Sequence, residues 1–310
     1  MGNASWETFV TSISGRGTAQ HRPILGAALM LCALAMLPGM DAIAKHLSAT
    51  LPTTEVTWGR FLFYLIAIAP LAFGKFGWRA IRPARPSLQV VRGILFAGSA
   101  YAFFLSIREM PLADTMAVFF IYPLIVLMAS ALVLGERIGP LRWLMVGLGF
   151  AGALLVIRPS LAGIALGDLF ALLAGVGYAF GMMVTRHLAP HDPGLVTGVI
   201  SSLIGVALFS GFMPSVWQAP SASEWGWMAL MGGIAAAGHY LLIVAHHKAT
   251  AAQLAPYGYA EIVSAIFFGL IVFGDWPTPI VWVGIVVIVA SGIVVTWSNA
   301  RLETARTDTP

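Results

Sequence analysis

Four ionisable side chains interrupt long apolar stretches of this sequence and are the first candidates for chemistry. They are Asp41, Arg60, His239 and Glu261. Such a group inside an apolar helix costs about 2.5 to 3.5 kcal/mol on insertion scales, so each needs a partner or a water-filled cavity. Glu261 lies deepest, about 14 Å from the start of its segment at 1.5 Å per residue. A carboxylate there predicts a site for a cationic group, or else a protonated side chain that packs against a neighbouring helix.

Glu261 belongs to a stripe of polar side chains. Counting by fours gives Gln253, Tyr257 and Glu261, and Ser264 follows three residues later, so these residues share one helix face. A polar face on an apolar helix must face water or the protein interior. We therefore predict that the stripe lines a cavity in which Glu261 binds the ammonium group of a zwitterion. Pro256 removes a backbone donor just before Glu261, which predicts an interrupted helix.

Aromatic and sulfur-containing side chains supply further candidates for the cavity wall, because they suit an adaptable apolar ligand. Pro123 is expected to kink a second helix beside Tyr122. A histidine such as His239 is able to shuttle protons near neutral pH, with hydrogen-bonded packing as the alternative. The predicted substrate-binding residues are Glu261, Tyr257, Gln253, Tyr122, His239, Tyr240, Tyr178, Met182, Asp41, Tyr101, Phe119 and Ser264.

Other charged residues near these segments have simpler interpretations. Arg60 follows Glu55 by five residues, and we expect the two to pair near the membrane surface. Glu136 and Asp275 fall in short turns, where capping or hydrogen bonding between repeats is expected. No metal site and no cofactor are expected. The single Cys32 lies in the first apolar run and is expected to be a buried, inert thiol.

The elements that position these residues must be membrane-spanning helices. The chain has 310 residues, 59% hydrophobic and 10% charged, whereas a soluble domain has roughly 25% charged residues. The apolar runs are long and unbroken, unlike the alternating segments of a β-barrel. A span takes about 20 residues, so the chain has room for ten spans and no aqueous domain. The expected segments are 24–47, 54–73, 88–107, 112–134, 141–157, 166–187, 194–213, 225–247, 252–273 and 278–297.

The basic residues predict the orientation of the chain. Residues 1–23 form a polar tail, and the apolar run that follows is expected to be a retained span rather than a signal peptide. With this tail in the cytoplasm, 13 basic residues, Arg92 among them, fall on the cytoplasmic side and three on the other. The positive-inside rule then places both termini, 1–23 and 299–310, in the cytoplasm. Basic residues are not clustered with aromatics, so no nucleic-acid partner is expected.

The second half of the sequence repeats the first. At an offset of 141 residues, Ala44-Lys45-His46-Leu47 aligns with Thr185-Arg186-His187-Leu188. At 140, Gly93-Ile94 aligns with Gly233-Ile234, and at 139, Tyr122 aligns with Glu261. Five spans per copy is an odd number, so the copies would be inserted in opposite orientations, as in many transporters. The predicted fold is all-α, with ten transmembrane helices in two inverted repeats, 24–158 and 164–298, around a central cavity.

The span plan, the repeat, and the pairs Gly135-Glu136 and Gly274-Asp275 together resemble the drug/metabolite transporter superfamily, specifically EamA-type members. Within that group the sequence is similar to bacterial amino-acid exporters of the YddG type. The resemblance implies a basket of helices around a cavity lined mainly by the first, third, fourth, sixth, eighth and ninth spans. It also implies a multi-pass protein of the bacterial inner membrane.

The resemblance and the polar stripe together predict secondary transport. We expect export of amino acids, aromatic or otherwise amphipathic, or of similar metabolites, by uniport or proton exchange. The alternative is export of cationic drugs or transport of nucleotide sugars, although phosphorylated sugars would require interior Lys or Arg residues. The expected partners are a small-molecule substrate, the lipid bilayer and protons. No Walker, HExxH or nucleophile-elbow motif is present, so the sequence indicates no enzyme.

Overall fold

The computed structural model describes residues 23–134, 139–157, 165–249 and 254–307, and within these ranges the chain forms helices and turns and no strand. The all-helical fold expected from the long apolar runs is therefore confirmed. In chain order the elements are α2 (Pro23–Leu47), α3 (Thr53–Phe76), η1 (Gly77–Ile81), α4 (Pro86–Glu109), α5 (Leu112–Phe119), α6 (Tyr122–Leu134), α7 (Pro140–Ile157), α8 (Leu166–Leu188), α9 (Gly194–Ser210), α10 (Met213–Val216), α11 (Ala222–Lys248), η2 (Ala255–Tyr259), α13 (Ala260–Phe268), η3 (Gly269–Phe273) and α14 (Pro279–Thr307).

Six helical segments in the described ranges are long and apolar enough to cross a membrane. They are Ile24–Leu47, Thr53–Ile81, Pro86–Glu109, Leu112–Ala129, Leu166–Leu188 and Ala222–Lys248. Shorter apolar helices cover Trp143–Ile157, Gly194–Ser210, Tyr257–Phe273 and Pro279–Val294. Each of these helices coincides with one apolar segment expected from the sequence, because the apolar runs end where proline, glycine or charged residues stop a span.

Two of the segments are interrupted at corresponding positions of the two halves. α5 ends at Phe119 and α6 begins at Tyr122, with Pro123 in its first turn. In the second half the 3-10 helix η2, with Pro256 at its start, precedes α13. Proline supplies no N–H to the helix ladder, which accounts for both interruptions. The expected kink at Pro123 and the expected break at Pro256 are both present.

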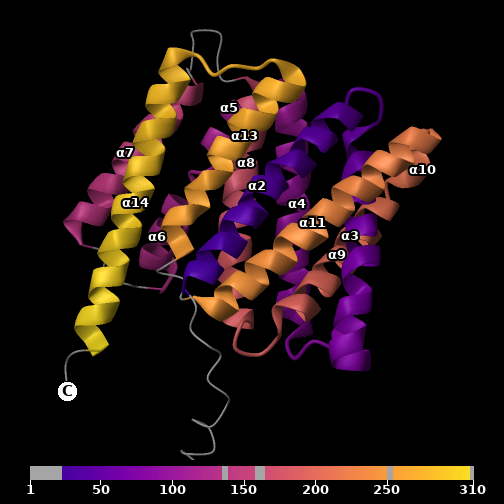
Figure 1. Cartoon of the computed structure of the whole chain (residues 1–310), viewed down its shortest axis with the longest axis horizontal. Coiled ribbons are helices and arrows are strands. Elements are labelled where there is room, and N and C mark those ends of the chain that lie inside the picture. The colour runs from indigo at the N-terminus through magenta and orange to yellow at the C-terminus, as the bar shows by residue number, and fades with distance from the viewer. Residues whose placement is uncertain (1–22, 135–138, 158–164, 250–253, 308–310) are drawn as a thin grey trace, which may run out of the picture.

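The helices pack in pairs that join the first half of the chain to the second. α2 packs along α11, α4 along α8, and α3 along α9. α7 and α14 form a further pair, at the left of Figure 1. Their backbones approach at Gly152 and Gly284, where a Cβ on either residue would lie 3.0 Å or less from the carbonyl oxygen of the other. Small residues allow such close contacts between membrane helices.

An ion pair ties the two halves together at one end of the bundle. Lys45 Nζ of α2 lies 3.0 Å from Asp275 Oδ2, in the turn after η3, and also donates a hydrogen bond to the carbonyl of Met110 at 3.0 Å. Asp275 thus makes the contact between repeats that its place in a turn suggested. Its sequence counterpart Glu136 lies outside the described residues.

The expectation for Cys32 was wrong, because its side chain is exposed. The second half of α2 is buried on almost all sides, whereas its first half has an open face on which Cys32 lies. Leu25 and Leu31, 40% and 41% exposed, are also unburied, so apolar character alone did not indicate burial. On a membrane-spanning helix an apolar residue can face lipid as easily as the protein interior.

Candidate functional site

Acidic and basic side chains from three helices lie close together inside the bundle. Asp41 of α2 is within electrostatic reach of Arg60 of α3 and of Glu261 of α13. Asp41 is 5% exposed, whereas Arg60 and Glu261 are half-buried. Ionisable groups inside a membrane-spanning bundle need partners of opposite charge or water, because lipid would not solvate them. The two carboxylates and one guanidinium can therefore bind a molecule that carries opposite charges.

The expected pair between Arg60 and Glu55 does not form. Glu55 is fully buried, its Oε2 accepts a hydrogen bond from the backbone N–H of Gln218 at 3.1 Å, and its Oε1 has no hydrogen-bond partner. Residues five apart on a helix point about 140° away from each other, so Arg60 faces another neighbour. Its carboxylate neighbour is Asp41, from a different helix.

An aromatic cluster of Phe119, Tyr122 and Tyr178 lies beside Glu261. The ring centroids are 4.8 Å apart for Tyr122 and Tyr178, 5.2 Å for Phe119 and Tyr178, and 5.4 Å for Phe119 and Tyr122. Both tyrosines are within electrostatic reach of Glu261. The interruption between α5 and α6 brings Phe119 and Tyr122 together against α8. Aromatic rings next to a carboxylate suit an organic cation with an apolar body.

His239 of α11 lies near Arg60, the basic residue of this charged group. Its Nδ1 is 2.7 Å from the carbonyl oxygen of Ala235, and a carbonyl only accepts, so Nδ1 carries a proton, and in the neutral ring Nε2 is an acceptor. The ring of Tyr64 meets the His239 ring edge-on, with centroids 5.6 Å apart. Arg60 and Arg92 are both within electrostatic reach of His239.

Of the other predicted site residues, Tyr101 has its described contacts elsewhere and three are exposed. Tyr101 packs against Phe209, with ring centroids 5.5 Å apart, and its hydroxyl accepts a hydrogen bond from Thr54 at 3.2 Å. Met182, Tyr240 and Tyr257 are each 39% exposed.

The predicted polar stripe around Glu261 does not run along one α-helix, because the segment is the 3-10 helix η2 followed by α13. Ser264 is half-buried on α13. η2 has about 3.0 residues per turn instead of 3.6, which rotates Tyr257 relative to Glu261. Gln253 lies outside the described residues. Contact of any of these residues with a substrate stays a prediction.

The sequence analysis missed Arg92 and Tyr64 as site residues. Arg92 was counted as a cytoplasmic basic residue, yet it lies six residues into α4 and bonds to α8 and α9. Removing it from the tally leaves 12 basic residues against three. Its place inside an expected span was the available signal, because a charge within a span is a functional candidate. Tyr64 carried no such signal in the sequence.

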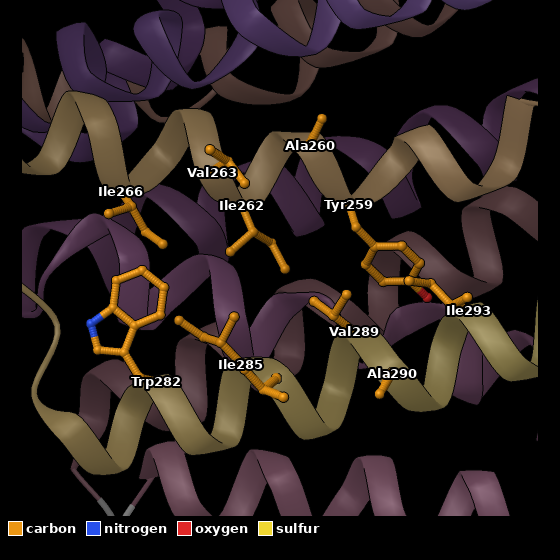
Figure 2. Close-up of a pocket in the computed structure, with 11 residues that line it drawn as sticks. Tyr259, Ala260, Ile262, Val263, Ile266, Trp282, Ile285, Val289, Ala290 and Ile293 are labelled. Atoms are coloured by element: carbon orange, nitrogen blue, oxygen red, sulfur yellow. The ribbon is translucent and has the colours of Figure 1, made fainter.

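A cavity elsewhere in the described part of the structure lies where η2 and α13 meet α14. Its volume is about 480 Å³, and Tyr259 and Ile262 on one side of it face Val289 of α14 on the other (Figure 2). No charged residue lines it, and Val263 and Val286 are 68% and 61% exposed. Such an apolar groove on a membrane protein suits lipid chains, so the candidate site is the charged and aromatic group around Glu261.

Comparison with known proteins identifies the same architecture elsewhere. A family model described as "EamA-like transporter family" matches residues 24–158 and 165–297. One solved crystal structure superimposes with a TM-score of 0.60 at 20% identity, covering 89% of this chain and 98% of the other, which shows a shared fold.

Three curated proteins illustrate the range of relatives. A riboflavin transporter of Rhizobium johnstonii is 24% identical, over 91% of this chain and 94% of its own. An S-adenosylmethionine uptake transporter of Rickettsia bellii is 23% identical, over 89% and 95%. A pseudopaline exporter of Pseudomonas aeruginosa is 27% identical, over 82% and 89%. The chain is therefore similar, over most of its length, to membrane transporters of different small molecules.

Proposed function

Because this chain belongs to the EamA-like transporter family, it is a membrane transporter and not an enzyme, and we propose that it carries amino acids or similar amphipathic zwitterions. The observation that supports this substrate class is Glu261 next to Tyr122 and Tyr178, with arginines nearby. The carboxylate would hold the ammonium group of the substrate, the aromatic rings its apolar part, and an arginine its carboxylate.

Interrupted helices also favour this location for the substrate. In transporters built from repeats, broken helices at corresponding positions of the two halves mark the binding site. Tyr122 starts α6, Glu261 lies in the first turn of α13, and the two residues are counterparts in the sequence repeat. Residues next to both interruptions therefore meet in one group.

We propose export as the direction, following the resemblance to amino-acid exporters. The names of the relatives include both uptake and export, so direction needs its own measurement.

The proposed architecture is ten spans in two inverted repeats, 24–158 and 164–298, in the bacterial inner membrane. The six long and four shorter apolar helices support the number. The contacts support the symmetry: α2 against α11 has its sequence counterpart in α8 against α4.

We also propose that both termini are cytoplasmic. The start of α2 and the end of α14 lie at the same end of the bundle (Figure 1), as an even number of spans requires. In a Cys32→Ser background, a cysteine at Glu109, whose side chain is 55% exposed, should react with an impermeant reagent from outside the cell, and one at the exposed Ser87 should not. The opposite labelling pattern would exclude this orientation.

The alternative substrate is an anion such as a nucleotide sugar, and the two arginines described in the structure bear on it. The sequence argument against phosphorylated sugars was that the membrane midplane offered no Lys or Arg. Arg60 and Arg92 are both within electrostatic reach of Tyr64 and Tyr178, which weakens that argument. The two acidic side chains at the same site still favour a zwitterion over a substrate with only negative charges.

Transport by the purified protein in liposomes tests the proposed function. We expect uptake of radiolabelled aromatic amino acids well above protein-free liposomes, and little uptake of a nucleotide sugar. An imposed pH gradient distinguishes proton exchange, which it accelerates, from uniport, which it leaves unchanged. Transport of the nucleotide sugar without any amino acid would contradict the proposal.

A further inference from the structure

We propose that Arg92, together with Thr185 and Ser201, forms a separate anion-binding subsite that holds the negatively charged group of the substrate on the opposite side of Tyr178 from Glu261. This inference rests on the proposed function and narrows its substrate class. The preferred substrates would be extended zwitterions, in which an aromatic or similarly wide group separates the positive charge from the negative one.

The guanidinium of Arg92 is held firmly in place by three neighbours. Its Nε donates a hydrogen bond to Thr185 Oγ1 of α8 at 2.6 Å, and its Nη1 donates to Ser201 Oγ of α9. The ring of Phe96, one turn further along α4, lies under the guanidinium with the carbon 4.3 Å from the ring centroid. A cation oriented in this way can present its remaining N–H groups in a fixed direction.

Arg92 has unused N–H donors and a positive charge that no described acidic side chain pairs with. A guanidinium has five N–H donors, and the hydrogen bonds described in the structure use two of them. Among the described residues no acidic side chain pairs with it. The acid at the start of α9, Asp192, instead accepts hydrogen bonds from Gln89 and from the backbone N–H of Ala84. A cation in this state, inside an apolar bundle, is stabilised by an incoming anion.

Arg60 differs from Arg92 in this respect. Arg60 has the carboxylate of Asp41 within electrostatic reach, whereas the groups described within reach of Arg92 are Tyr64, Tyr178 and His239, none of which is a carboxylate. An anionic group of a substrate would therefore compete with Asp41 at Arg60 but meet no competing carboxylate at Arg92. This contrast is the reason for assigning the subsite to Arg92.

A chain of ring contacts runs from Arg92 to the tyrosines near Glu261. The Phe96 ring beneath Arg92 lies 5.1 Å from the Tyr178 ring, which lies 4.8 Å from the Tyr122 ring beside Glu261. Tyr178 is within electrostatic reach of both Arg92 and Glu261. An α-amino acid carries its ammonium and carboxylate on one carbon atom, so we expect it to engage one pole at a time. A molecule with an aromatic spacer between its charges can do so while packing against Tyr178.

The test compares ligands that differ only in the negative group. The probes are 4-(aminomethyl)benzoate, whose charges lie at opposite ends of a benzene ring, and benzylamine, which lacks the carboxylate. We expect the purified wild-type protein to bind the zwitterion about tenfold more tightly than the amine, since hydrogen bonds to charged groups are the stronger kind. Arg92→Gln should abolish that preference and leave benzylamine binding unchanged, and Arg92→Lys should retain part of it.

Arg108→Gln is the matched control, because Arg108 lies on the same helix with its side chain 50% exposed. It should keep the wild-type preference. Equal losses for both ligands in Arg92→Gln and in Arg92→Lys would mean that Arg92 only cross-links α4, α8 and α9, and would overturn the subsite. If the wild-type protein binds phenylalanine but shows no preference between the two probes, the subsite is wrong and the proposed function stands. Binding of no zwitterion at all would reject both.

Discussion

Replacing Glu261 by glutamine should weaken the binding of zwitterionic and cationic substrates about a hundredfold, with the unfolding temperature of the protein close to that of wild type. Glutamine keeps the volume and some hydrogen bonding but removes the charge. A charged hydrogen bond contributes roughly 1.5 to 3 kcal/mol, and a hundredfold change lies within that range. A carboxyl that stays protonated and only packs against its neighbours would tolerate the change. Affinity measured in detergent, alongside thermal unfolding, distinguishes these two roles.

The same variant separates substrate contact from proton coupling. If Glu261 holds the substrate, binding falls and transport falls with it. If Glu261 only carries a coupling proton, binding survives and the response of transport to a pH gradient disappears. Glu109→Gln is the matched control, because it removes a carboxylate whose side chain is 55% exposed at the end of α4. Wild-type binding and gradient-dependent transport by Glu261→Gln would reject the site around Glu261.

The helical segments were predictable because each is recorded locally in the sequence. Apolar runs end at proline, glycine and charged residues, and the structure has its helices on the same segments. Pro123 and Pro256 likewise marked the two interrupted helices, since the loss of one backbone donor is a local property. The depth of Glu261 and its alignment with Tyr122 came from spacing and from the repeat, and the structure brings both residues to one cluster.

The partners of the charged residues could not be read from local spacing. Glu55 is near Arg60 in the chain, but helix geometry turns it away, and Asp41 from another helix takes its place. Arg92 was counted among the cytoplasmic basic residues because the charge count uses only position along the chain. It does not consider which helices pack against the residue. Tyr101 shares its residue type with Tyr122 but lies against α9. Which side chains meet depends on which helices pack together, and the spacing of residues along one sequence does not reveal that packing.

Arg60→Gln should be the most destabilising single substitution among the charged residues of the site, by about 2 kcal/mol. Breaking a direct buried ion pair costs roughly 3 to 5 kcal/mol, and the cost should be smaller here because Arg60 and Asp41 are electrostatic neighbours rather than a direct pair. Here the residual charge is Asp41, 5% exposed and within electrostatic reach of a second carboxylate, Glu261. Asp41→Asn leaves an arginine that no longer faces an acid but has Tyr64 and Tyr178 nearby, so its cost should be smaller.

The double variant Asp41→Asn/Arg60→Gln tests whether these two charges are coupled. It should be more stable than Arg60→Gln alone, although it carries one more substitution, because it no longer leaves Asp41 without a counter-charge. Two interacting residues typically show a coupling of about 0.5 to 3 kcal/mol in such a cycle. Thermal unfolding of the four proteins in detergent measures it. Additive effects would mean that Asp41 and Arg60 are independent, and Asp41 would then no longer belong to the charged group around Glu261.

If the two residues are coupled, benzylamine binding by Asp41→Asn should fall less than benzylamine binding by Glu261→Gln, because Arg60 already offsets the charge of Asp41.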